Sequence, residues 1–492
     1  MYLEKPEISA PEQTTTEEML NDYYLAHLSR QLSIMGRREV HNGRAHFGIF
    51  GDGKEIAQLA YAKAFKKGDW RSGYYRDQTF MLALGILQPE EFFSMIYGDT
   101  DDRINPSTGG RNFNNHFTTS NIDENGEIKN LSEHYNSASD ISSTGGQMPR
   151  LLGLAQASKI VRDNPEIKKH LNNNVTGNEV AFGSIGDAST TEGMFFETIN
   201  AAAVMQVPLA VAVYDDGFGI SVPIELQTAK SSISKALKGF QKEKNTNGIE
   251  IFTAKGWDYP GLVKTFAEGI KYCRTEQVPV LFHIQEVNQP LGHSTSGSHE
   301  RYKSKDRLEW EKEYDGVNQF RKWLLESGKA DVETLTEIEK KAKKRASAAK
   351  KSAWKNYSSG YKKEAEKLKE ILQKIKEQSA GKVDKQDDLE KINQRVFPTR
   401  RKYFTFAKRL FYELHSDDSL KNEREELRNW ISAFNKRSRD FYSRQLYREN
   451  ADAAIKVDPV PVKYDDNPED VNGAVILNSN FERLFQKYPN LV

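Results

Sequence analysis

Two acidic clusters each follow a short apolar run, and carboxylates are ligands that hard metal cations prefer. Asp187 comes just after the run Val180–Ile185. Asp215–Asp216 come just after the run Val207–Tyr214. Such runs are typical of strands buried on both faces of a parallel sheet, and Thr191–Met205 between them has the length of a helix. The pattern predicts a βαβ unit with both clusters past the carboxyl ends of its strands, where open parallel sheets bind ligands.

The surroundings of Asp187 indicate which ligand this edge could take. Asp187 follows a glycine and precedes a helix, so a ligand there would meet free backbone N–H groups and a favourable helix dipole. Those groups attract phosphate, whereas the carboxylates repel it. Mg²⁺ usually takes one or two carboxylates together with phosphate oxygens, so the spacing favours a magnesium diphosphate over a bare phosphate. The alternative, from the residues alone, is a pair of acidic loop turns that cap a helix.

The stretch Gly186–Ser221 resembles the thiamine diphosphate motif, in which GDG is followed by NN. More narrowly, it is similar to the alpha subunit of the decarboxylating component of 2-oxo acid dehydrogenase complexes. TTEG, NAA and GFGIS stand where that family has SEG, N-x-A and GYAIS. There are two departures, Ala188 for the last Gly of GDG and Asp215–Asp216 for NN. We expect metal binding to survive both, because alanine is small and Asp216 keeps an oxygen ligand.

The resemblance implies thiamine diphosphate and Mg²⁺ as cofactors. The carboxylates of Asp187 and Asp216 and the carbonyl of Phe218 would hold the metal ion. SGYYRDQTF matches the family's YRD segment, whose arginine suits a diphosphate, although without the resemblance that arginine would pair with a nearby acid. SSTGGQMP resembles the segment that contacts the aminopyrimidine, but Thr144 replaces a large apolar residue that props the cofactor. The expected cofactor contacts are Tyr75, Arg76, Ser142, Thr144, Gly186, Asp187, Ala188, Asp216, Phe218, Ile220 and His293.

Two histidines are expected to be catalytic, because imidazole gains or loses a proton near neutral pH. His116 lies in GGRNFNNHF, which resembles the family's GxGGxMHxY-like segment. His293 lies in LGHSTSGS, which resembles the family's GHS(x)SD loop, although Gly297–Ser298 stand where the family has Asp. The alternative for each is a histidine with no catalytic role.

A literal GDG at residues 51–53 is not expected to be the cofactor motif. No apolar strand precedes it, and no Asn or Asp pair follows at the required distance. The family has a Gly-Glu-Glu-like turn here, preceded by an aromatic residue near the substrate. Phe47, beside His46, takes that position and is the expected substrate contact.

The resemblance implies the alpha half of a 2-oxo acid dehydrogenase. Such an enzyme decarboxylates a 2-oxo acid on thiamine diphosphate and transfers the acyl group to a lipoyl-bearing acyltransferase component. A beta subunit or beta domain would supply the glutamate that activates the aminopyrimidine. GHSTS and GFGIS favour branched-chain substrates, and pyruvate remains possible. Two alternatives stay open: another thiamine-dependent enzyme such as an acetoin-cleaving dehydrogenase, and a non-catalytic scaffold partner.

We expect an α/β thiamine diphosphate-binding fold, with a mainly parallel sheet flanked by helices, over residues 17–325. A disordered arm over 1–16 would precede it, and 118–139 would be an insertion or mobile loop. A charged helical region over 326–456 would follow, as a solvated helical hairpin with a narrow apolar seam. Residues 457–492 would form an extended linker and the first helix of a beta-type domain, cut off before its sheet. The seam consists of Leu368, Ile371, Leu372 and Ile375.

Composition argues against several classes of partner. The 492 residues carry a net charge of +1, which indicates no overall field for nucleic acid or membrane surfaces. The single cysteine, Cys273, cannot form an internal disulfide and fits a reducing cytoplasm. The sequence has no apolar run of about eighteen residues and no signal-peptide pattern. We therefore expect a soluble, cytoplasmic protein that binds neither nucleic acid nor membrane.

Overall fold

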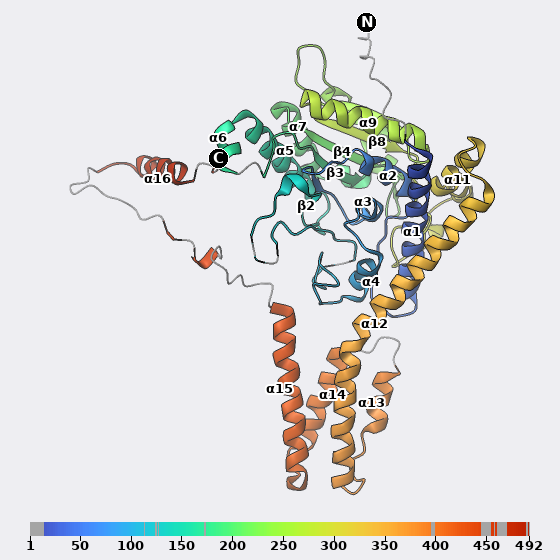
Figure 1. Cartoon of the computed structure of the whole chain (residues 1–492), viewed down its shortest axis with the longest axis vertical. Helices are drawn as coiled ribbons and strands as arrows, with labels where there is room; N and C mark the ends of the chain where they lie inside the picture. The colour runs from blue at the N-terminus through green and yellow to red at the C-terminus, as the bar shows by residue number, and fades with distance from the viewer. Residues whose placement is uncertain are drawn as a thin grey trace.

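An α/β domain carries a long helical arm in the computed structural model of the chain (Figure 1). Most of the expected N-terminal arm, and most of the extended linker expected from residue 457 to about 467, lies outside the residues that the structure describes. The described residues are 14–112, 114–123, 125, 127–171, 174–394, 399–443, 454–456, 458–459, 470–488 and 491.

Six strands form the sheet of the domain, in the order β2-β1-β3-β4-β8-β7. Every neighbouring pair in this sheet is parallel. The expectation of an α/β fold with a mainly parallel sheet and flanking helices is therefore confirmed. The strands are β1 (Trp70–Ser72), β2 (Asn136–Ser137), β3 (Ala181–Gly186), β4 (Leu209–Tyr214), β7 (Glu250–Lys255) and β8 (Val280–Gln285).

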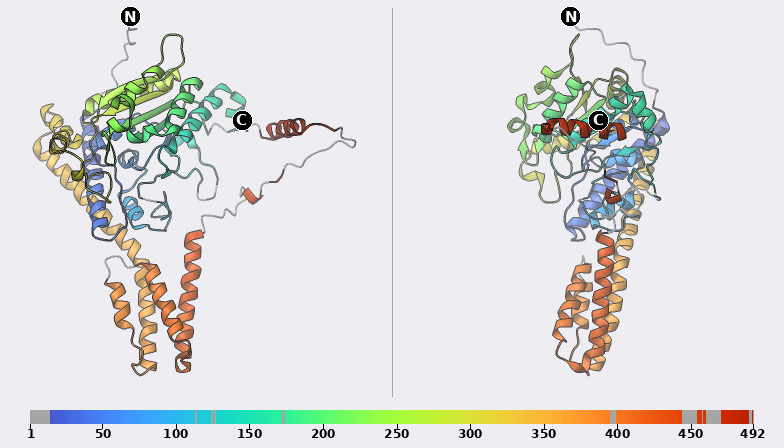
Figure 2. Two further views of the ribbon diagram at one scale, coloured as in Figure 1. Left: turned by 180° about the vertical axis from the view of Figure 1, so that it is seen from behind. Right: turned by 90° about the vertical axis from the view of Figure 1, so that its left-hand side faces the viewer.

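The two central strands, β3 and β4, are buried along nearly their whole length because helices cover both faces of the sheet (Figure 2). Leu209, Val211 and Val213 of β4 pack with helices α5 and α7 on one face. Ala210 and Ala212 of the same strand pack with α1, α2 and α9 on the other. The helices of the domain are α1 (Thr16–His41), α2 (Glu55–Lys63), α3 (Gln78–Ala83), α4 (Pro89–Tyr97), α5 (Gln147–Asp163), α6 (Pro165–His170), α7 (Gly193–Met205), α8 (Ile233–Ala236), α9 (Tyr259–Glu276), α10 (Lys305–Glu313) and α11 (Gly316–Glu326).

The predicted βαβ unit is present as β3, α7 and β4. The two strands pair in register, with Gly186 opposite Tyr214. The chain therefore leaves both strands at the same edge of the sheet, immediately before the two acidic clusters. Helix α7 begins at Gly193 rather than at the expected Thr191, because a 3₁₀ turn over Ala188–Thr191 comes first.

Helix α1 begins after a capping threonine. Thr15 caps it: its side-chain oxygen accepts a hydrogen bond from the Glu18 N–H at 3.2 Å, and the Glu18 carboxylate accepts one from the Thr15 N–H at 2.7 Å. These reciprocal bonds form a capping box. The helix runs to His41.

The long helix α12 (Val332–Gln378) belongs to both the domain and the arm. In its first half a row of buried alanines packs against α1 and α4, because small side chains let helices approach closely. The domain core therefore continues into α12 beyond residue 325. The first half of this helix is thus not part of the solvated hairpin that the sequence predicts for 326–456. The buried alanines are Ala342, Ala346, Ala349 and Ala353.

The second half of α12 packs with three further helices to form the arm, α13 (Gln386–Asn393), α14 (Arg400–Glu413) and α15 (Lys421–Ser443). The predicted apolar seam lies in the core of this arm, where all four of its residues are buried. Helix α16 (Gly473–Lys487) lies apart from the domain and the arm (Figure 1). No helix in the described part of the chain is long and apolar enough to cross a membrane.

The expected insertion at 118–139 contributes a short edge strand, β2. The Asn136 side-chain amide donates to the carbonyls of Leu131 at 2.8 Å and His134 at 3.2 Å. The Arg71 guanidinium donates to the Ser137 hydroxyl at 2.9 Å. These bonds fix the end of the segment to the sheet, so 136–137 are not part of a free loop. Residues 124 and 126 lie outside the described part.

The GDG at 51–53 is a tightly packed turn between α1 and α2, with no strand before it. Gly53 has a left-handed φ of 85°, and a Cβ at this position would lie 2.0 Å from the Asn288 carbonyl oxygen. A Cβ on Gly51 would lie 2.2 Å from the Arg76 carbonyl oxygen. The two glycines are therefore required because other backbone segments approach them closely.

We expect Gly53→Ala to lower the free energy of unfolding by at least about 2 kcal/mol. A left-handed alanine costs about 1–2 kcal/mol, and relief of the overlap with Asn288 adds about 1–3 kcal/mol. Gly85→Ala is the matched control, since Gly85 has φ of 71° but no atom within 4 Å of its Cβ position. Denaturant unfolding of both variants measures the difference, and equal losses would show that the close approach contributes nothing.

Candidate functional site

The Asp187 carboxyl group is buried at the carboxyl end of β3 with an unsatisfied oxygen. Its side chain is 4% exposed, and Oδ2 has no hydrogen-bond partner in the described part of the chain. The Asp187 N–H donates to the Tyr214 carbonyl at 3.1 Å, which holds the residue beside the end of β4. A buried, unpaired carboxylate is unfavourable unless a cation neutralises it. The site therefore fits a bound metal ion.

The two aspartates after β4 have different partners. His283 Nε2 lies 2.8 Å from Asp215 Oδ2 and, because a carboxylate only accepts, this ring nitrogen carries the hydrogen. Asp216 accepts hydrogen bonds from the Phe218 N–H at 3.2 Å and from the Lys54 ammonium at 3.3 Å. Asp215 is thus held by β8, whereas Asp216 belongs to the cluster around Asp187.

The acidic and basic groups at this edge shift one another's pKa values. Burial raises the pKa of the Asp187 carboxyl well above its usual range, and the charges of Asp216 and Asp215 raise it further. Burial also acts to raise the pKa of Asp216, but Lys54, Arg76 and Lys303 outweigh it and lower that pKa below its usual value. Cations thus surround Asp216, and positive charges of this kind suit an anionic ligand at this edge.

Arg76 lies at the centre of the loops above this edge. Its guanidinium is buried and donates to the Phe50 carbonyl at 2.6 Å and to the His293 carbonyl at 3.0 Å. It also lies over the Tyr75 ring, 5.3 Å from the ring centroid. Arg76 therefore fixes the loop before α2 to the loop after β8, with the aromatic ring of Tyr75 beside it.

The loop of His293 is paired with the loop of Phe47. Gly48 and Thr295 exchange two hydrogen bonds, each 2.9 Å long, through the Gly48 N–H and carbonyl. Burial first, and then the charge of Arg76, lower the pKa of His293 to about 4, although Asp216 opposes this. The His293 imidazole is therefore neutral near pH 7.

His116 and Ser142, both expected at the cofactor, are in contact. His116 Nδ1 lies 3.2 Å from the Asn114 carbonyl, and a carbonyl only accepts, so Nδ1 carries the hydrogen. In the neutral ring Nε2 then accepts from the Ser142 hydroxyl, 2.9 Å away. The His116 ring is 3% exposed and its centroid lies 6.5 Å from that of Tyr75. These contacts place the 116 and 142 loops near Arg76.

The loop after Asp216 forms a short antiparallel hairpin of β5 (Phe218–Gly219) and β6 (Val222–Pro223). The Phe218 ring lies 5.7 Å from the Tyr302 ring and 5.3 Å from the Lys303 ammonium. Ile220 at the turn has a left-handed φ of 59°, which is strained for a β-branched residue, and its side chain is 60% exposed. Strain of this kind is concentrated at functional loops.

The remaining expected cofactor contacts lie along the same edge. Gly186 ends β3 and Ala188 begins the 3₁₀ turn. A Cβ on Gly219 would lie 2.9 Å from the Ala188 Cβ, so the hairpin covers this turn. Thr144 is exposed and makes no hydrogen bond with any described residue. Neither Thr144 nor Ile220 is joined to the carboxylate cluster by a hydrogen bond of its side chain.

Lys54 and Arg307 are two of the cations near Asp216 that were not expected as site residues. Lys54 directly follows the GDG turn that the sequence argument excluded from the site. Arg307 of α10 donates to the Asp216 carbonyl at 2.8 Å and to the Glu311 carboxylate at 3.0 Å. The spacing of Arg307 and Glu311, one turn apart in a helix, reads as an ordinary surface pair. Only the fold brings either residue to Asp216.

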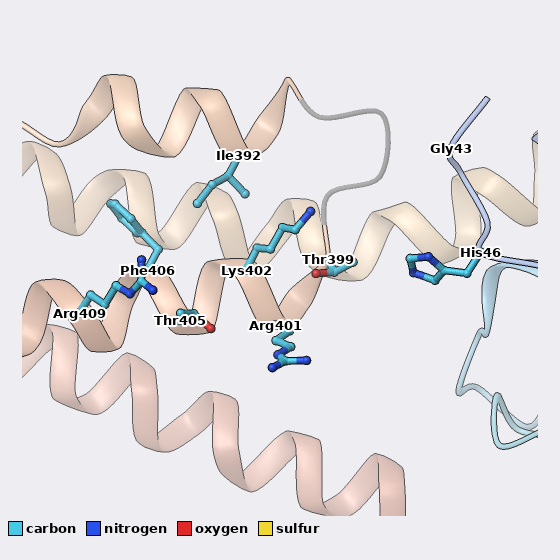
Figure 3. Close-up of a pocket in the computed structure, with 9 residues that line it drawn as sticks. All are labelled: Gly43, His46, Ile392, Thr399, Arg401, Lys402, Thr405, Phe406 and Arg409. Carbon is cyan, nitrogen blue, oxygen red and sulfur yellow. The ribbon is translucent and has the colours of Figure 1, made fainter. Parts of the chain in front are cut away.

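A groove of about 810 Å³ between α14 and the 43–46 loop is separate from this edge. Figure 3 shows that its cations, Arg401, Lys402 and Arg409, point in different directions and do not converge. At the sheet edge itself, no group of three or more His, Cys, Asp or Glu side chains within the described ranges is arranged to hold a metal ion. A metal ion there would need oxygen ligands beyond the carboxylates.

Comparisons with known proteins agree with this geometry. The sequence model of a family described as "Dehydrogenase E1 component" matches residues 23–359. The chain is similar to 2-oxoisovalerate dehydrogenase subunit alpha 1, mitochondrial, of Arabidopsis thaliana, with 27% identity over 308 aligned residues. The alignment covers 61% of this chain and 56% of that relative. It is similar to 2-oxoisovalerate dehydrogenase subunit alpha of Bacillus subtilis, with 26% identity over 316 residues that cover 64% of this chain and 84% of the relative. It is also similar to pyruvate dehydrogenase E1 component subunit alpha of Acholeplasma laidlawii, with 27% identity over 352 residues that cover 69% of this chain and 86% of the relative.

We expect Asp187→Asn to change stability and binding in opposite directions. Removing the buried, unpaired charge should raise the melting temperature of the free protein. Loss of the charged ligand should weaken magnesium-dependent binding of thiamine diphosphate by about 10–100-fold, since an interaction with a charged group contributes about 1.5–3 kcal/mol. Thermal unfolding and calorimetric titration measure the two effects.

Asp52→Asn is the control for this substitution. Asp52 is equally buried but lies in the GDG turn, where it accepts a hydrogen bond from the Leu291 N–H at 3.0 Å, as asparagine also can. Cofactor affinity should stay within a few-fold in this variant. Unchanged affinity in Asp187→Asn would overturn the metal assignment.

Proposed function

This chain belongs to the dehydrogenase E1 component family, and on that premise we propose that it is the alpha part of a thiamine diphosphate-dependent 2-oxo acid dehydrogenase. The observation that carries the proposal is the buried Asp187 carboxylate, whose Oδ2 lacks a partner among the described residues. Mg²⁺ bound at Asp187 and Asp216 would neutralise it. The surrounding cations suit a diphosphate on the other side of the ion.

We propose that Asp187, Asp216 and the carbonyl of Phe218 hold Mg²⁺, and that Arg76 and His293 contact the diphosphate. When bound, thiamine diphosphate supplies the nucleophilic carbon and the electron sink that decarboxylation needs. The protein orients the group between the 3₁₀ turn after β3 and the loops that Arg76 joins.

The two histidines are suited to different roles. Burial and the charge of Arg76 lower the pKa of His293 to about 4, so its ring is neutral at pH 7 and is proposed to orient a reacting group by a hydrogen bond. His116 donates from Nδ1 to a carbonyl and accepts from the Ser142 hydroxyl at Nε2. A proton can therefore pass between the His116 ring and the hydroxyl without movement of either loop. Phe47, on the loop paired with that of His293, is proposed to contact the substrate.

Branched-chain 2-oxo acids are the favoured substrates in this proposal. The Arabidopsis and Bacillus relatives are named for 2-oxoisovalerate, whereas the Acholeplasma relative is named for pyruvate. Their identities to this chain are nearly equal. Two observations support the branched-chain class: two of these relatives are named for 2-oxoisovalerate, and the GHSTS and GFGIS segments favour the same class. Pyruvate is the second candidate.

We propose that the active enzyme contains a beta-type partner and delivers its acyl group to a lipoyl-bearing acyltransferase. The family resemblance assigns to the beta half the glutamate that activates the aminopyrimidine. In this chain the hairpin after Asp216 and helix α7 expose several large apolar side chains, which suits burial against a partner. They are Met194, Phe196, Val204, Ile220, Val222 and Leu226.

We expect the purified chain to be inactive alone and to decarboxylate 2-oxo acids once a beta-type protein of the family is added. The assay uses an artificial electron acceptor and a panel of 2-oxoisovalerate, pyruvate, 2-oxoglutarate and acetoin, followed by acyl transfer to free lipoamide. We expect turnover of 2-oxoisovalerate at least about tenfold above pyruvate. Activity of the chain alone would refute the split site. Preference for acetoin, or no activity with any beta partner, would refute the proposed reaction.

We expect His293→Ala to lower turnover by about 10²-fold or more if the ring orients a reacting group. Binding of thiamine diphosphate should weaken far less, because Arg76 contacts the carbonyl of His293 and not its ring. His41→Ala, at the exposed end of α1, is the control and should change neither quantity. Steady-state kinetics and calorimetry separate the two effects. Small, equal losses in turnover and binding would leave His293 a structural role only.

A further inference from the structure

The Lys54 ammonium is buried beside the carboxylate cluster. The residue is 2% exposed, and its Nζ lies 2.8 Å from the Gln289 side-chain oxygen, 3.3 Å from Asp216 Oδ2 and 3.5 Å from the Asn288 carbonyl. Two of these partners are neutral, so Asp216 is the anion that balances the ammonium charge. Taking either charge of such a pair out of water alone is strongly unfavourable.

The backbone holds Lys54 in this position. Lys54 is the N-terminal flanking residue of α2, and its N–H donates to the Gly51 carbonyl at 3.3 Å. Gly53, the residue before it, has a left-handed φ, and the Asn288 carbonyl packs closely against its Cα. The side chain therefore starts from a fixed turn and points into the protein, so the ammonium cannot reach solvent by a simple rotation of the side chain.

Each acidic residue after β4 has a basic partner of its own. Asp215 is paired with His283 of β8, 2.8 Å away, and Asp216 with Lys54, 3.3 Å away. Asp187 has no such partner among the described residues, since its Oδ2 is unsatisfied. The extra negative charge of Asp216, which stands where the resembling family has asparagine, is thus offset within the chain.

We propose that Lys54 is the internal counter-ion of Asp216, which positions this carboxylate and keeps the free site from binding Mg²⁺ tightly before the diphosphate arrives. The inference rests on the proposed function of the site. The Lys54 ammonium offsets one negative charge beside Asp216, so its removal makes the cluster more negative by one charge. Close charges at a protein surface interact strongly, so this difference should change the affinity for Mg²⁺ alone by at least about tenfold.

A double-mutant cycle tests the pairing in the free protein, without turnover. We expect Lys54→Met and Asp216→Asn each to lower the melting temperature, because each leaves one buried charge unpaired. The double variant Lys54→Met/Asp216→Asn should recover at least half of the summed loss. Lys63→Met is the matched control, since Lys63 lies on the same helix and pairs with Asp22 at 2.9 Å, and it should show no coupling to Asp216→Asn.

Titration with MgCl₂ alone, followed by thermal shift, tests the effect on the metal. Lys54→Met should bind Mg²⁺ at least about tenfold more tightly than the unmodified chain, and the double variant should not. Equal Mg²⁺ affinity, or a double variant no more stable than Asp216→Asn alone, would overturn the inference. The second comparison holds even if Lys54→Met itself does not fold.

A third titration separates this inference from the proposed function. Thiamine diphosphate is added with Mg²⁺ to the unmodified chain, alone and with a beta-type protein. If thiamine diphosphate binds but the two substitutions show no coupling in melting temperature, the counter-ion role is refuted and the proposed function stands. If thiamine diphosphate does not bind but the two substitutions are strongly coupled, the proposed function is refuted. The ion pair between Lys54 and Asp216 would then have a role in stability only.

Discussion

The parallel, in-register pairing of β3 with β4 is the constraint on which the site depends. It brings Asp187 and the Asp215–Asp216 pair to one edge of the sheet, inside the protein, where like charges repel strongly. The fold accommodates this arrangement by placing cations from three separate segments around Asp216: Lys54, Arg76 and Lys303. The unsatisfied Asp187 oxygen that remains is the part of the site that a bound cation would complete. Sheet geometry and electrostatics thus act together to define one cation position.

Backbone carbonyls hold the loops above this edge together. Arg76 donates to the carbonyls of Phe50 and His293, and Arg37 donates to the Ser294 carbonyl at 2.9 Å. Arginine is suited to this because its planar group presents several donors in fixed directions. Because these acceptors are backbone atoms, the sequence of the loops can vary while the connection stays. This explains how the loop of His293 keeps a defined position although it lacks the family's aspartate.

The parts of the fold that follow from local patterns could be predicted from the sequence, and those that depend on distant contacts could not. Apolar runs located β3 and β4 in the sequence. The first half of α12 reads as a solvated Lys- and Ala-rich helix, because only the approach of α1 and α4 makes its alanines a core. Lys54 was missed for the same reason: its neighbour Asp216 is 162 positions away in the chain.

The departures from the family pattern at this edge are best understood as a balance of charge. Exchanging two neutral residues for Asp215 and Asp216 adds two negative charges beside Asp187. Lys54 lies within hydrogen-bonding distance of Asp216 and offsets its charge, whereas His283 of β8 donates a hydrogen bond to Asp215. The amino-acid types of a binding motif can therefore change while its electrostatic character is kept, provided that the compensating groups are close in space. A motif comparison that considers only neighbouring positions in the chain overlooks this compensation, because the compensating residues come from other elements of the fold.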